Sequence, residues 1–136
     1  MPTPLYNALI RTHHITSRKK VAALKRAADT HSCFVLLRSG GCPGIMYVEG
    51  LEQGQVEGWV GVVKRLRYKD FQLVRKPAEL VPESGSGSEV IPDDLSLGRA
   101  TGRDVGLNEV ESVKEFGSLM AQRGVWGWWR KGMGYS

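Results

Sequence analysis

Four side chains form a nominal Cys2His2 set of zinc ligands: the adjacent His13 and His14, and the two cysteines, Cys33 and Cys42. A zinc site of this composition usually separates its cysteines by about two to four residues and its histidines by about three to five. Here the cysteines are nine positions apart and the histidines are neighbours. Neighbours in a strand point to opposite faces, so we expect one buried and one exposed imidazole. The sequence predicts no metal site and no cofactor.

Two glycine-containing segments have the composition of catalytic loops but not their patterns. Residues 39–44, SGGCPG, lack the GxxxxGK[ST] and GxGxxG patterns that bind phosphate, so we expect a turn between two strands. Residues 84–88 lack the strand–turn–helix frame that exposes a hydrolase nucleophile. An acyl-phosphate hydrolase would need an arginine in a phosphate loop and a positioned asparagine, and residues 39–44 supply neither. We therefore predict no catalytic residues and a chain that is not an enzyme.

Two clusters of basic residues give the clearest indication of a ligand. The first contains Arg18, Lys19 and Lys20, and the second contains Lys64, Arg65, Arg67 and Lys69. The second cluster is expected near a helix C-terminus, where cations also complement the helix dipole. The first is expected at a helix N-terminus, where cations oppose the dipole and indicate an external anion such as phosphate. The alternative for both clusters is ordinary solubilising charge.

The charge of the chain is unevenly distributed over its 136 residues. The net charge is +5, and residues 1–80 contain 13 Lys and Arg against 6 Asp and Glu. Residues 81–111 contain 2 basic against 7 acidic residues, so an acidic segment follows a basic one. A basic protein favours polyanionic partners, with nucleic acid ahead of a membrane surface. No apolar run is long enough to cross a bilayer and no leader pattern is present, so we expect an intracellular protein, nuclear or cytoplasmic.

The apolar pattern predicts alternating strands and helices. We expect strands at residues 8–15, 33–38, 45–49 and 71–76, with Pro77 ending the last, and helices at 18–28 and 56–66. This order is the split βαβ pattern, so we predict an α+β, ferredoxin-like fold with a four-stranded antiparallel sheet. One shared core is predicted to contain Val21, Leu24, Phe34, Ile45, Val48, Trp59, Val63 and Leu73.

A single domain with three parts is predicted. Residues 8–81 form the core, residues 82–104 form a flexible acidic connector, and residues 105–136 form a helical extension. We expect Asn108 to cap the first helix of the extension, with Glu111 completing a capping box. The tail contains Trp126, Trp128 and Trp129, which either pack over the open sheet face or stack on bases. Packing is the interpretation we favour.

Several blocks of the sequence resemble a known family. THHITSRKK, GGCPGIMYVEG, WVGVVKRLRYKDF and KEFGSLMAQRG occur in this order. They are similar to the domain of unknown function 1115, which includes the C-terminal domain of spliceosomal pre-mRNA-processing factor three and also occurs in RWD-domain-containing proteins. The resemblance implies a ferredoxin-like fold with additional C-terminal helices. It also implies binding to small nuclear RNA, at a duplex and an adjacent single strand, as in a small nuclear ribonucleoprotein.

Within this resemblance, His13, His14, Lys19 and Lys20 match the first basic block, and Pro43 and Gly44 match the hairpin. We therefore predict a non-enzymatic RNA-binding module that contacts phosphates through basic helix ends. The predicted RNA-binding residues are His13, His14, Arg18, Lys19, Lys20, Lys64, Arg65, Arg67 and Lys69. The alternative is a protein-interaction adaptor that binds a partner through the connector or the tryptophan-rich tail.

Overall fold

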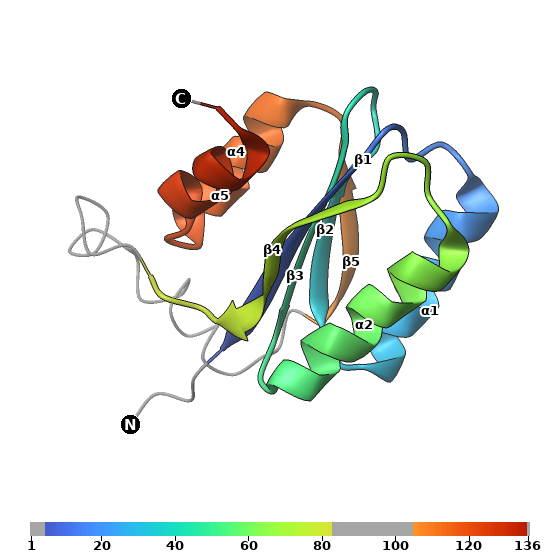
Figure 1. The fold of residues 1–136 in the computed structure, drawn as a ribbon, viewed down its shortest axis with the longest axis horizontal. Coiled ribbons are helices and arrows are strands. Elements are labelled where there is room, and N and C mark those ends of the chain that lie inside the picture. Colours follow the sequence, from blue (N-terminus) through green and yellow to red (C-terminus); the bar gives the residue numbers. More distant parts are fainter. Residues whose placement is uncertain (1–4, 83–104, 136) are drawn as a thin grey trace.

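The computed structural model describes residues 5–82 and 105–135 (Figure 1). The elements in chain order are β1 (Tyr6–Thr12), α1 (Arg18–Thr30), β2 (Phe34–Arg38), β3 (Gly44–Gly50), α2 (Gln53–Leu66), β4 (Gln72–Glu79), β5 (Gly106–Val110), α4 (Val113–Gln122) and α5 (Trp126–Met133). The predicted α+β class is confirmed. The predicted connector lies outside the described residues, apart from Pro82.

One five-stranded sheet organises the fold, in the order β4-β1-β3-β2-β5. The first four strands pair antiparallel, and β5 pairs parallel to β2. The prediction of a plain four-stranded antiparallel sheet was therefore wrong. The missing strand is Gly106–Val110, a short segment with little alternation of polar and apolar residues. It becomes a strand because it pairs with β2, a long-range interaction that its own composition does not indicate.

Several element boundaries differ from prediction; β1, predicted at residues 8–15, spans Tyr6–Thr12. Asn108 lies within β5 and does not cap a helix. The cap of α4 is Ser112, whose hydroxyl accepts from the Glu115 amide at 3.0 Å, while the Glu115 carboxylate completes the capping box. Pro77 does not end β4, which continues to Glu79. A proline is tolerated there because β4 is an edge strand and need not donate on its open side.

Two helical layers cover the two faces of the sheet (Figure 1). The α1–α2 layer encloses a core that includes Val21, Leu24, Val48, Trp59 and Val63. The prediction of one shared core was wrong for Phe34 and Ile45, which belong to a second core under α4 and α5. Alternate residues of a strand face opposite sides, so a sheet covered on both sides divides its apolar residues between two cores.

The tryptophan-rich tail forms α5 and packs against the second face. Trp129 is buried with 3% exposure, Trp128 is half-buried, and Trp126 remains 45% exposed. Packing is thus the main role of this segment, as favoured from the sequence. Across residues 5–82 and 105–135, no helix combines the length and apolar character needed to cross a membrane.

Candidate functional site

Three loops meet at the end of the sheet where α1 begins and α2 ends. They are the β1–α1, β2–β3 and α2–β4 connections, and His13 joins them. Its amide donates to the Lys69 carbonyl at 2.9 Å, and its carbonyl accepts from the Gly44 amide at 3.1 Å. The backbone therefore holds these loops in a fixed arrangement around one imidazole.

The same arrangement brings the two predicted basic clusters together. The Lys20 ammonium lies 4.9 Å from the centre of the Tyr68 ring, and Tyr68 is flanked by Arg67 and Lys69. We call this surface the basic end; it consists of Lys19, Lys20, Lys64, Arg65, Arg67 and Lys69. All of these side chains are exposed except Lys20, which is half-buried. None of them forms an ion pair with another residue of the described ranges.

Tyr68 forms the base of this surface. Its side chain is buried, and burial raises the pKa of the phenol to about 12. Within the described residues its hydroxyl has no hydrogen-bond partner. The ring therefore stays neutral at physiological pH and presents its face to the Lys20 cation, an interaction that fixes this lysine beside the second cluster.

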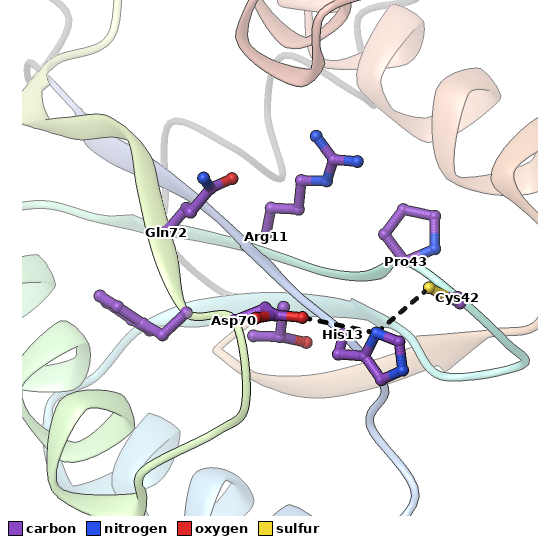
Figure 2. Close-up of a pocket in the computed structure, with 8 residues that line it drawn as sticks. Arg11, His13, Cys42, Pro43, Asp70 and Gln72 are labelled. Carbon is purple, nitrogen blue, oxygen red and sulfur yellow. Dashed lines mark hydrogen bonds and ion pairs between the residues drawn. The ribbon is translucent and has the colours of Figure 1, made fainter.

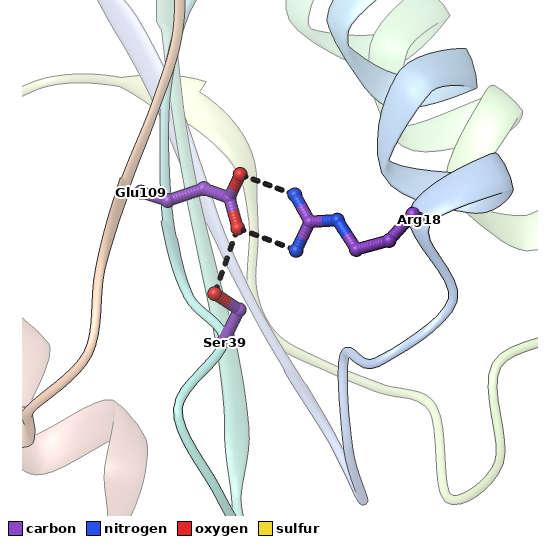
Figure 3. Close-up of polar contacts among 3 residues, drawn as sticks. All are labelled: Arg18, Ser39 and Glu109. Carbon is purple, nitrogen blue, oxygen red and sulfur yellow. Dashed lines mark hydrogen bonds and ion pairs between the residues drawn. The ribbon is translucent and has the colours of Figure 1, made fainter.

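Arg18 differs from its neighbours because it has a partner inside the protein (Figure 3). Its guanidinium donates two hydrogen bonds to the Glu109 carboxylate of β5, at 3.1 and 2.6 Å. The Ser39 hydroxyl donates a third at 2.8 Å. These hydrogen bonds, chiefly those from Arg18, hold the pKa of Glu109 below its usual value. Arg18 therefore already has an anionic partner within the protein and does not require an external one.

A pocket of about 470 Å³ opens beside the basic end (Figure 2). It is lined by Arg11, Thr12, His13, Cys42, Pro43, Asp70, Phe71 and Gln72. Arg11 is exposed and carries no ion pair to any described residue. Sequence reasoning missed Arg11 because it is a single cation in an apolar strand. The only signal was its position at the end of that strand, next to the histidine pair.

The prediction that His13 and His14 point to opposite faces of a strand was wrong. β1 ends at Thr12, and the His13 and His14 rings lie edge to face with centres 4.2 Å apart. The His13 Nδ1 atom lies 3.7 Å from Cys42 Sγ and 3.6 Å from Asp70 Oδ2 (Figure 2). A thiol–imidazole–carboxylate relay needs both ring nitrogens, and here the two partners share one. This geometry does not form a catalytic relay.

Cys33 takes no part in this group. It is buried under α2, and its thiol contacts the backbone oxygens of His31 and Gln55 at 3.4 Å. Burial raises the pKa of the Cys33 thiol to about 12, so it remains protonated and unreactive. The two cysteines and two histidines therefore do not form one group, although His13, His14 and Cys42 lie together.

Comparison of the chain with protein-family models found no match, and comparison with curated protein sequences found none either. The geometry of the loops and of the basic end therefore carries the functional argument.

Proposed function

We propose that this protein is a non-enzymatic RNA-binding module that binds phosphate groups through the basic end. The observation that carries the proposal is the contact of Lys20 with Tyr68, which joins basic clusters more than forty residues apart into one surface. Exposed lysine and arginine side chains that have no carboxylate partner among the described residues are available to phosphate oxygens. Arg11 and His13 extend this surface into the adjoining pocket.

This fold is better suited to binding the phosphate backbone of RNA than to recognising bases on the face of its sheet. Proteins of the RRM class stack bases on an open sheet face. Here helices cover both faces, and α5 packs on the face that the first two helices leave free (Figure 1). The loop end is therefore the surface on which we place the nucleic acid.

The kind of RNA follows from the family resemblance. The strands in the order β4-β1-β3-β2, with α1 and α2 on one face, support the ferredoxin-like core that the resemblance implies. The spliceosomal member of that family binds a duplex with an adjacent single strand. We expect the duplex backbone to lie on the basic end, and the single strand to approach Arg11 in the pocket.

The test is an RNA titration at several salt concentrations, followed by fluorescence anisotropy. The probes are a short duplex with a single-stranded extension, the blunt duplex, and the single strand alone. Lys19→Gln/Lys20→Gln and Lys64→Gln/Lys69→Gln should each weaken binding for all sequences and flatten the salt slope by about 2. Lys114→Gln/Lys131→Gln, on α4 and α5, makes the same charge change elsewhere and should have little effect.

Two results would contradict the proposal. One is the absence of salt-sensitive binding to any of the three probes at ~50 mM salt. The other is an equal loss of affinity in the α4–α5 control and in the variants of the basic end, because that result would mean that only net charge matters.

A protein-interaction role is the second candidate, and the groove between α4 and α5 favours it. The groove has a volume of about 370 Å³ and is bordered by the exposed Trp126 and by Trp129. The buried Trp129 Nε1 atom has no hydrogen-bond partner among the described residues. If this role is correct, Trp126→Ala should lose a bound protein that the lysine variants retain, and RNA binding should be unchanged.

A further inference from the structure

The geometry points to a transition-metal site formed by His13, His14 and Cys42, with Zn²⁺ as the ion that fits best. One ligand atom from each of these residues lies within 4.8 Å of the other two. The inference stands independently of RNA binding, because it depends only on the mutual distances and the chemistry of these side chains.

The distances are close to those of a zinc centre. With Zn–N of about 2.0 Å and Zn–S of about 2.3 Å, tetrahedral geometry places a nitrogen and a sulfur ligand ~3.5 Å apart. The observed separation of His13 Nδ1 and Cys42 Sγ is 3.7 Å. The His14 and Cys42 side chains are exposed, so closing the remaining gaps needs only side-chain rotation.

We assign Asp70 as the fourth ligand; it lies outside the group of three, and its side chain must turn to reach the ion. Its Oδ2 atom lies 3.6 Å from the same Nδ1 atom of His13, and its side chain is 66% exposed and able to turn (Figure 2). Both Asp70 and Cys42 thus converge on the nitrogen that would bind the ion. The four ligands come from three loops, so the ion would tie the β1–α1, β2–β3 and α2–β4 connections together.

The donor set selects the class of metal. A thiolate and two imidazoles suit Zn²⁺ and its spectroscopic substitute Co²⁺, whereas Mg²⁺ and Ca²⁺ prefer sites made of oxygen ligands. Binding takes the proton from the Cys42 thiol and releases it to the buffer. The thiolate and the Asp70 carboxylate then neutralise the two charges of the ion, so the basic end keeps its own positive charge.

The experiment uses the full chain without a histidine tag, kept reduced by a non-thiol reductant. Co²⁺ is added and absorption is recorded, and Zn²⁺ is then used to displace it. We expect a one-to-one complex with thiolate-to-cobalt charge-transfer absorption. Cys42→Ser should abolish that absorption, and His14→Ala should weaken Zn²⁺ binding at least ~10-fold. Cys33→Ala, which removes the other thiol, should change neither.

Circular dichroism of each variant establishes that it is folded; Cys42 and His14 are exposed, so their replacement leaves the cores intact. The proposal is overturned if charge transfer survives in Cys42→Ser, or disappears in a folded Cys33→Ala. It is also overturned if calorimetry detects no one-to-one Zn²⁺ complex with the wild-type protein.

Discussion

The two faces of the sheet are closed by different chemistry. Under α1 and α2 the side chains are mainly aliphatic, and the Trp59 indole satisfies its N–H by donating to the Leu24 carbonyl at 3.1 Å. Under α4 and α5 the core is rich in aromatic rings and contains the buried carboxylate of Glu49. One layer is held by apolar burial, and the other also depends on a polar network.

That network runs through the second core. Asn7 donates to the Tyr47 hydroxyl at 3.2 Å, and Tyr47 donates to Glu49 at 2.6 Å. Arg123, the C-cap of α4, donates to the other Glu49 oxygen at 2.7 Å and lies 3.6 Å from the Phe34 ring centre. Burial, followed by the Glu49 charge, raises the pKa of Tyr47 well above its usual value. Such a network fixes where α4 sits, because a half-satisfied arrangement is costly.

The largest effect is expected in the aliphatic layer. Trp59→Ala should lower the free energy of unfolding by about 3–5 kcal/mol, because it leaves a cavity and removes the hydrogen bond from the indole to the Leu24 carbonyl. Denaturant unfolding followed by circular dichroism measures this change. Trp126→Ala removes an exposed indole and serves as the control. An unchanged unfolding midpoint for Trp59→Ala would mean that apolar burial does not hold this layer.

The aliphatic layer was also the more predictable of the two. Helical spacing identified Val21, Leu24, Trp59 and Val63 as core residues, and the structure confirms them. The second layer was predicted only in outline: the C-terminal tail was expected to pack over the open sheet face, but the strand residues were not divided between the two faces. Phe34 was therefore assigned to the wrong core.

The basic end illustrates the same limit. Residue types and local spacing located both clusters, but the fold decides that they meet at Tyr68. The pairing of Arg18 with Glu109, 91 positions away, and the approach of Asp70 and Cys42 to His13 depend on tertiary contacts. Local pattern carries no information on such pairs. A parallel edge strand such as β5 cannot be predicted from the local sequence for the same reason.

The second-largest effect is expected in the layer under α4 and α5, which contains the polar network. Arg123→Ala leaves the Glu49 carboxylate buried without its cation, so we expect a loss of about 3 kcal/mol in unfolding free energy. Glu49→Gln in the Arg123→Ala background should restore part of the loss, because the unpaired buried charge is gone. A double-mutant cycle by denaturant unfolding gives the coupling. Independent, additive losses would show that the pair does not act as a unit and would remove the distinction between the layers.

The smallest effect is expected for the ion pair between Arg18 of α1 and Glu109 of β5, which joins the two described ranges of the chain. Because the folded pKa of Glu109 is lowered, the pair stabilises the protein above the unfolded carboxyl pKa, and this contribution disappears as pH falls through the folded value. Glu109→Gln should therefore lower stability slightly at pH 7, and the gap to wild type should close under acid. The Arg18 side chain is 65% exposed and that of Glu109 30% exposed, so the gap stays below those of the core variants and shrinks in high salt. A gap that is independent of pH and salt, measured by thermal unfolding, would assign the loss to packing of β5 and not to the ion pair.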